Sequence, residues 1–417
     1  MEKFKPTNIK GASDMLPQVQ MLRNRVTGVL RKNFENYGYA PIETAMVNYL
    51  EVLSYKYDEN AEIVREIYKI KDQGERDLGL RFDLTVPFAK FIATNRNLKM
   101  PFRRYEIGKV WRNGPVKAGR LREFYQCDID VVGTKGQVVE AEIIALGIKC
   151  YLELGIVPVV KYGNRNLLVE IIAGVVNVGN NMDKVIGVID RLEKLSKEEF
   201  LSELSKFMTK KQSEELLDKL GKGKKNAEVL VLEDALNNFG VLEYCVFSPS
   251  LARGLNVYTS TVWEVYDKAG RIASSIGGGG RYDKIITNWI DNGLEYPAVG
   301  MTFGLEPVMH LLSMNENQNE ASYVDIMVVS MQESGKVLVG ANKLADGLRA
   351  EGVKILLWTG GKVGRAMEYA DKENISHVIV IGEKEVENKK IVIKDMKDGK
   401  EKSFGIGELA KIAKETK

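Results

Sequence analysis

Five strand-like runs follow one another in the first third of the chain, and turns rather than helices join them. Parallel neighbours would need long crossover connections, usually helices, whereas antiparallel neighbours can be joined by tight turns. This succession therefore predicts a largely antiparallel sheet and an α+β fold. The runs are YAPIETAMV, IVREIYKIKD, LGLRFDL, RRYEIGKVWRN and REFYQCDIDVVG.

Helical periodicity lies around this sheet. Apolar residues recur at helical spacing from Gln18 to Tyr37, before Gly38, and again from Val138 to Leu154. From about 167 to 242 the chain turns to Lys/Glu-rich amphipathic segments such as KEEFLSELSKFMTKKQSEELLDKL, which predict a helical insertion. Strand-like runs then resume, and GLEPVMHLLSM closes the region as a helix.

A polar stretch without periodicity, NENQNEAS at residues 315–322, predicts a linker. Beyond it strands and helices alternate, as in YVDIMVVSM, VKILLWTG and HVIVIGE, which is typical of a small α/β domain. We therefore expect a core at 1–314, the linker, and a second domain at 323–417.

Composition excludes several kinds of chemistry. Only two histidines are present, and the three cysteines are far apart with no C-x-x-C pair. These counts argue against a Ser-His-Asp triad and against a multi-histidine metal site, and we assign no metal ligand among the side chains. With 60 Lys+Arg against 57 Asp+Glu, no global charge drives binding to nucleic acid. No secretory signal or run of eighteen apolar residues is found, so we expect a cytoplasmic protein without a membrane anchor.

The segment FRRYEIGKVWRNGPVKAGRLREFYQCDID concentrates arginine in two strand-like runs around a turn. Alternation places Gln126, Asp128 and Asp130 on one strand face, where Arg112 from the first run could share their pocket. Guanidinium groups in such a cluster suit a phosphate or carboxylate, although a solvated basic edge strand fits the same pattern. The arginines are Arg103, Arg104, Arg112, Arg120 and Arg122.

Three further patterns are each ambiguous. SSIGGGGRYD permits close approach of a ligand to the backbone, or tight packing, but matches no dinucleotide or P-loop motif. LRFDLTVP is interpreted as a strand with Asp83 and Thr85 on one face, which is either a polar site or a surface face. Arg253, in an apolar context near Tyr258, needs an anion from the protein or from a substrate.

Taken in order, these motifs resemble those of the histidyl-tRNA synthetases, which are class II aminoacyl-tRNA synthetases. GYAPIETAMVNYLE resembles motif 1, GKVWRNGPVKAGRLREFYQCDID motif 2 and VGMTFGLEPV motif 3. LARGLNVYTSTVWE and GGGGRYD resemble two signatures of the histidine enzymes. The resemblance implies a class II antiparallel core, a C-terminal anticodon-binding α/β domain and, through motif 1, a homodimer.

The resemblance also implies substrates and residue roles. The substrates would be L-histidine, ATP with Mg²⁺, and tRNA(His), joined through a histidyl-adenylate. Arg112 and Arg253 match the arginines on the α-phosphate, which makes them the candidate catalytic residues. Asp83, Thr85 and Gln126 match the contacts of the α-amino end, Asp130 and Tyr258 the imidazole pair, Phe124 the adenine-stacking ring and Arg120 a phosphate contact.

The sequence departs from the family pattern mainly near the nucleotide. Gly114 stands in place of an acid, Asn256 and Val257 in place of an Asp-Tyr pair, and Pro307 in place of the motif 3 arginine. The alternative is thus a paralogue that binds histidine but ligates poorly, as a sensor or regulatory subunit. The C-terminal domain favours the tRNA-using enzyme.

Overall fold

The computed structural model describes residues 5–55, 62–116, 121–192, 195–252, 257–314 and 322–415. The chain divides into two compact units, with the break near residue 311 and residues 15–22 grouped with the second. None of the described helices is long and apolar enough to cross a membrane.

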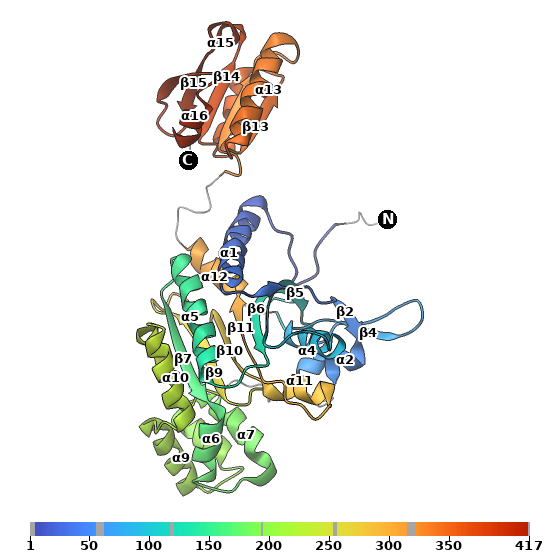
Figure 1. Ribbon diagram of the computed structural model, residues 1–417, viewed down its shortest axis with the longest axis vertical. Coiled ribbons are helices and arrows are strands. Elements are labelled where there is room, and N and C mark those ends of the chain that lie inside the picture. The colour runs from blue at the N-terminus through green and yellow to red at the C-terminus, as the bar shows by residue number, and fades with distance from the viewer. Residues whose placement is uncertain are drawn as a thin grey trace. The chain divides into compact units, whose positions relative to one another are not determined.

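An eight-stranded sheet forms the centre of the first unit, in the order β1-β5-β6-β11-β10-β9-β7-β8 (Figure 1). Only β1–β5 and β7–β8 pair in parallel, so the expectation of a largely antiparallel sheet is confirmed. The strands are β1 (Ala40–Pro41), β5 (Phe102–Trp111), β6 (Glu123–Val132), β7 (Pro158–Asn164), β8 (Cys245–Phe247), β9 (Thr261–Asp267), β10 (Gly277–Arg281) and β11 (Ala298–Gly304).

Helices cover both faces of this sheet. On one face lie α1 (Pro17–Asn36) and α5 (Gln137–Glu153), where Phe34 of α1 and Tyr151 of α5 both contact the ring of Phe303. On the other, α4 (Thr85–Thr94) packs with α11 (Asp283–Ile290) in a cluster that includes Phe88 and Ile286. After β11 the chain enters α12 (Leu305–Ser313).

The first three strand predictions are only partly right, because the strands there are much shorter than predicted. Besides β1, the structure forms a small antiparallel sheet of β2 (Val47–Tyr49), β4 (Asp77–Leu80) and β3 (Lys69–Lys71), with the short helices α2 (Leu50–Ser54) and α3 (Glu62–Arg65). Asp83 and Thr85 are not on a strand face, because β4 ends at Leu80 and Thr85 begins α4. Pro87 is compatible with this first turn, where a backbone N–H has no helical partner.

The helices of the insertion are α6 (Arg165–Ala173), α7 (Met182–Ile189), α8 (Lys197–Leu204), α9 (Lys210–Lys222) and α10 (Ala227–Asn238), with 3₁₀ turns at Gly179–Asn181 and Leu242–Tyr244. Ser196 and Thr209 begin α8 and α9 with capping boxes, which satisfy backbone donors of the first turn. Leu168, Val185, Phe200 and other buried residues give this region its own apolar cluster.

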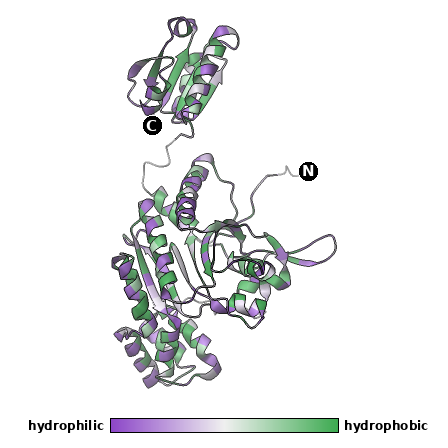
Figure 2. Cartoon of the chain, viewed as in Figure 1, coloured by the Kyte–Doolittle hydropathy of each residue, from purple (hydrophilic) through white to green (hydrophobic). Residues whose placement is uncertain are grey.

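The second unit contains a five-stranded sheet in the order β13-β12-β14-β15-β16. Figure 2 shows mostly hydrophobic strands between helices that carry hydrophilic residues. The C-terminal β16, α15 and α16 were not expected, since their short sequences are rich in Lys and Glu. The elements are β12 (Ile326–Ser330), α13 (Gly335–Ala350), β13 (Ile355–Thr359), α14 (Val363–Lys372), β14 (His377–Ile381), α15 (Glu383–Asn388), β15 (Lys390–Asp395), β16 (Glu401–Gly405) and α16 (Leu409–Glu415).

Candidate active site

A cavity of about 380 Å³ lies over β6, β10 and β11 and brings together most of the predicted site residues. Arg120 and Arg253 lie outside the described residues, as does Asn256. The predicted residues that line the cavity are Asp83, Thr85, Arg112, Phe124, Gln126, Asp130 and Tyr258.

The floor of the cavity is one face of β6. Gln126, Asp128 and Asp130 all line it, whereas Cys127 and Ile129 are completely buried on the opposite face. This is the alternation expected of a strand. The pleat therefore delivers an amide and two carboxylates to the same side of the sheet.

Asp130 is held by a buried guanidinium. Arg104, which has no exposed surface, places Nη2 2.7 Å from Oδ2 of Asp130 and Nη1 3.6 Å from Oε2 of Glu106. Arg81 pairs with the other oxygen of Glu106 at 2.9 Å. Burial raises the pKa of Asp130, while Arg104 and a hydrogen bond from Tyr282 oppose that rise.

Tyr282 and Gly300 fix the position of the Asp130 side chain. The Tyr282 hydroxyl donates to Oδ1 of Asp130. Gly300 is the cross-strand partner of Asp130 on β11, and a Cβ at Gly300 would clash with the same oxygen. The absence of a side chain at Gly300 therefore lets the carboxylate lie across the neighbouring strand.

Asp83 enters the cavity from the start of α4. Its Oδ1 accepts a hydrogen bond from the backbone N–H of Val86 at 3.0 Å, which satisfies a donor of the first helical turn. Burial raises its pKa to about 6, against the lowering effects of the Val86 hydrogen bond and the charge of Arg112. Thr85 lies beside it in the cavity wall.

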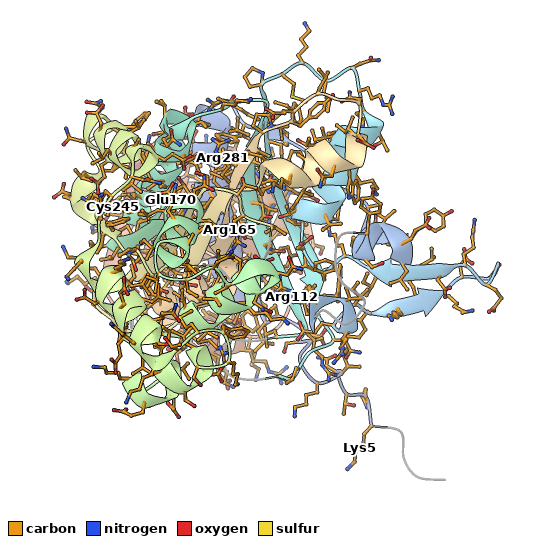
Figure 3. The ribbon with its side chains drawn as sticks, turned by 90° about the horizontal axis from the view of Figure 1, so that it is seen from below. Lys5, Arg112, Arg165, Glu170, Cys245 and Arg281 are labelled. Atoms are coloured by element: carbon orange, nitrogen blue, oxygen red, sulfur yellow. The ribbon has the colours of Figure 1, made fainter. Side chains whose placement is uncertain are left out.

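Arg112 directly follows β5 and is oriented by two contacts. Its Nε donates to the carbonyl oxygen of Phe82 at 3.1 Å, and its guanidinium carbon lies 5.1 Å from the centre of the Phe124 ring. Figure 3 labels Arg112 between the helices of the insertion and the β3–β4 hairpin as seen in that view. A cation thus lines the cavity close enough to Asp83 for its charge to act on that carboxylate.

The start of α12 closes another side of the cavity. Glu306 accepts a hydrogen bond from the backbone N–H of Tyr125 at 3.0 Å, and burial raises its pKa. Pro307 and Val257, two of the departures from the family pattern, line the cavity directly. Gly114, another departure, is buried, and its carbonyl accepts a hydrogen bond from Nε of Arg122 at 3.2 Å.

The glycine run lies in β10. The structure supports both of the roles that the sequence left open, close approach of a ligand and tight packing. Gly278 and Gly279 line the cavity. A Cβ at Gly279 would clash with the Gly300 carbonyl and Trp263, and one at Gly280 would come within 2.6 Å of the Tyr258 ring. These glycines therefore permit tight packing and also leave room for a ligand.

Sequence reasoning assigned no role to four side chains that line the cavity or contact its residues: Arg104, Asp128, Tyr282 and Glu306. Asp128 shares its strand face with Gln126 and Asp130, so strand alternation in the sequence is sufficient to indicate its position. Arg104 was only one of five clustered arginines, and Tyr282 only part of GGGGRYD. Within the described ranges, no group of three or more His, Cys, Asp and Glu side chains is placed to hold a metal ion.

Comparisons with known proteins agree along the whole chain. A family model described as histidyl-tRNA synthetase matches residues 11–308, and one described as an anticodon binding domain matches 324–416. The chain is 38% identical to histidine–tRNA ligase 1 of Bacillus thuringiensis subsp. konkukian (strain 97-27), over 97% of this chain and 98% of that protein. It is 34% identical to the histidine–tRNA ligase of Clostridium acetobutylicum, over 98% and 99%.

Among solved structures, the chain is similar to the histidyl-tRNA synthetase from Nostoc sp. PCC 7120. The TM-score is 0.84 at 27% identity, with 99% of this chain and 100% of the other covered.

Proposed function

We propose that this chain, which belongs to the histidyl-tRNA synthetase family, is a histidine–tRNA ligase that forms histidyl-adenylate from L-histidine and ATP and transfers the histidyl group to tRNA(His). One observation carries the proposal: a single cavity is lined by carboxylates of β6 and of the segment before α4 and also by the Arg112 guanidinium. An amino acid carries an ammonium and a carboxylate, so a cavity that offers both signs of charge suits it.

In this proposal the acidic side of the cavity binds histidine. Asp83, Thr85 and Gln126 bind the α-amino end, with the carboxylate as the charge partner. Asp130 and Tyr258 bind the imidazole, since one ring nitrogen donates a hydrogen bond and the other accepts one. The contacts of Asp130 with Arg104 and Tyr282 support this role because they hold its carboxylate in a fixed orientation.

Arg112 and Arg253 are proposed to act on the reacting groups. The histidine carboxylate attacks the α-phosphorus of ATP, pyrophosphate leaves, and the terminal ribose hydroxyl of the tRNA later attacks the adenylate. Both arginines neutralise charge that develops on the α-phosphate, so catalysis rests on positioning and electrostatics. No protein nucleophile is required, consistent with a chain that has two histidines.

ATP would extend from Arg112 along the motif 2 hairpin, with adenine on Phe124 and Arg120 near the phosphates. One face of the Phe124 ring already carries the Arg112 guanidinium, so adenine would use the other. Mg²⁺, when bound with ATP, would neutralise phosphate charge; with no cluster of protein ligands among the described side chains, phosphate oxygens and water suit it.

The remaining assignments follow from the family. The domain at 324–416 would bind the anticodon of tRNA(His). We propose that the protein is cytoplasmic.

We also propose a homodimer. Motif 1 of class II enzymes builds the subunit interface, and Met46, Val47 and Tyr49 expose large apolar side chains there. One chain has a mass of 46.7 kDa, and sedimentation analysis should give twice that mass. The proposed domain limits stay at 1–314, 315–322 and 323–417.

Histidine-dependent ATP–pyrophosphate exchange tests the proposal. We expect exchange with L-histidine and none without it, and its absence at saturating ATP, Mg²⁺ and L-histidine would exclude the ligase. Arg253→Ala should abolish exchange and leave histidine binding nearly unchanged. The alternative of a histidine sensor is not favoured, because the chain has the anticodon-binding domain and its relatives are ligases over their full length.

A further inference from the structure

Asp128 differs from the two acids nearest to it in forming no ion pair with a cation. It is only 4% exposed, and on the neighbouring strands it faces Glu106 of β5 and Thr302 of β11. Glu106 and Asp130 each form ion pairs with buried arginines. Within the part of the chain that the structure describes, Asp128 has no ion pair. Its Oδ1 has no hydrogen-bond partner, although a hydrogen bond from the Thr302 side chain favours its ionised form.

The charges beneath the cavity leave one carboxylate unmatched. Glu106, Asp128 and Asp130 are all at least 95% buried, and only the two guanidinium groups of Arg81 and Arg104 accompany them. Three acids minus two cations leave one acid. The short contacts of the two cations are with Glu106 and Asp130, and Arg104 acts on Asp128 through its charge without forming an ion pair with it. An unpaired buried carboxylate is costly, so its presence in a cavity wall indicates a ligand.

Asp83 indicates which part of a ligand Asp128 would meet. Both carboxylates line the same cavity, and the charge of Asp83 is one of those that act on Asp128. An ammonium group has three N–H donors and can therefore bind two carboxylates and a further acceptor. Asp130 is less suited to this role, since it already has a cationic partner in Arg104 and accepts a hydrogen bond from Tyr282.

We propose that Asp128 is a histidine-binding residue whose carboxylate accepts a hydrogen bond from the α-ammonium group, alongside Asp83. This inference rests on the proposed function, since it takes L-histidine as the ligand. Asp128 then selects for a free amino group, while Asp130 and Tyr258 select for the imidazole. A cation bound here supplies the direct ion pair that Asp128 does not form with the described side chains.

The ionisation of Asp128 supports this placement. Burial raises its pKa to about 7, and the charge of Arg104 opposes that rise. A ligand cation beside the carboxylate favours the ionised form, so binding releases a proton at pH values near or below 7. The groups that face Asp128 are Glu106 and Arg104 of β5, Gln126 and Asp130 of β6, Thr302 of β11, and Asp83 before α4.

Calorimetric titration with two ligands tests the proposal. L-Histidinol keeps the ammonium and the imidazole, whereas 3-(imidazol-4-yl)propionate lacks the ammonium. At pH 8, Asp128→Asn should weaken L-histidinol binding about 10-fold or more and leave imidazolepropionate binding within about twofold, because only the first ligand loses a charged hydrogen bond. Equal weakening of both ligands, or no change in either, would overturn the assignment.

The pH dependence of L-histidinol binding gives a second readout. The ligand titrates identically in measurements on the variant and on wild type, so its titration cancels in the ratio of the two dissociation constants. The ratio of L-histidinol dissociation constants, variant over wild type, should be smaller at pH 6 than at pH 8, because Asp128 is largely protonated at the lower pH. A ratio that does not depend on pH contradicts the proposal. Asp291→Asn, an exposed acid at φ +42°, is the matched control and should change neither ligand.

Two outcomes separate this inference from the proposed function. If the wild-type chain does not bind L-histidine, the proposed function fails. If it binds L-histidine and Asp128→Asn binds both ligands as wild type does, only the role of Asp128 fails. Thermal melting checks the fold of the variant, and Asp128→Ser, which also lacks the carboxylate, repeats the comparison if Asp128→Asn does not fold.

Discussion

The Tyr282 hydroxyl donates a hydrogen bond to Oδ1 of Asp130, although the two residues are 152 positions apart in the chain. Tyr282 follows β10, Asp130 lies on β6, and β11 runs between these strands. The bond therefore crosses a strand, and Gly300 of β11 provides the room for it. The phenol and Arg104 together leave Asp130 little rotational freedom, which lowers the entropy lost when a ligand binds.

Tyr282→Phe should weaken L-histidine binding while the protein remains folded. The change removes one hydrogen bond to a carboxylate, worth about 1.5–3 kcal/mol, so we expect the dissociation constant to rise about 10-fold or more. Tyr151→Phe is the matched control, because the Tyr151 phenol is also buried and donates to the Ile276 carbonyl at 2.8 Å. Calorimetry should show normal histidine affinity for the control; equal losses in both variants would contradict a specific role for Tyr282.

Gly300→Ala should also impair histidine binding, through a different cause. The added methyl group would clash with Oδ1 of Asp130 and displace the carboxylate from its contacts. We expect at least about a 10-fold loss of affinity, since a hydrogen bond to a charged group is disrupted. In Gly28→Ala, an added Cβ meets nothing within 4 Å and lies in α1, so that variant should gain about 0.5–1 kcal/mol of stability. Unchanged histidine affinity in Gly300→Ala would show that the carboxylate does not depend on this space.

Arg104→Met should destabilise the first unit strongly. It leaves the carboxylates of Asp130 and Glu106 without a shared buried cation, and breaking a buried pair in this way costs about 3–5 kcal/mol. Urea unfolding measures the loss as a lower midpoint. Arg349→Met removes an exposed guanidinium that pairs with Asp346, and its midpoint should change little. Similar midpoints for the two variants would contradict the role of Arg104.

The sequence predicted best what depends on local periodicity. Strand alternation was sufficient to place Gln126, Asp128 and Asp130 on one face of β6, and the two hairpin strands occur where expected. The strand predicted for LRFDLTVP was wrong because apolar residues alternate in this segment as they do in a strand, although β4 ends at Leu80 and α4 begins at Thr85. In the structure Arg81 is buried against Glu106 and Thr44, and Asp83 contacts the first turn of α4.

Partners that are distant in sequence were not predictable in this way. The pairing of Asp130 with Tyr282, and the need for glycine at position 300, follow from the order of β6, β11 and β10 in the sheet. A period-two pattern specifies which way a side chain points, but not which strand lies beside it. The family resemblance identified Asp130 and Tyr258 as a pair, but it did not identify the buried arginine that orients the acid.

Asp83→Asn should change the pH dependence of stability in a defined direction. The folded pKa of Asp83 is about 6, raised by burial from an ordinary value of 3.8, so the folded state holds this proton more tightly than the unfolded state. The contribution of Asp83 to stability is therefore most favourable below pH 4 and is lost as the pH rises through about 6.

Asparagine at position 83 keeps an oxygen that can accept a hydrogen bond from Val86 N–H but has no carboxyl proton to lose. Relative to wild type, the variant should become more stable between pH 4 and pH 7, by up to about 3 kcal/mol at about 1.4 kcal/mol per pKa unit. Urea unfolding of both proteins at several pH values measures this difference, and a difference that stays constant or falls with rising pH would contradict the raised pKa.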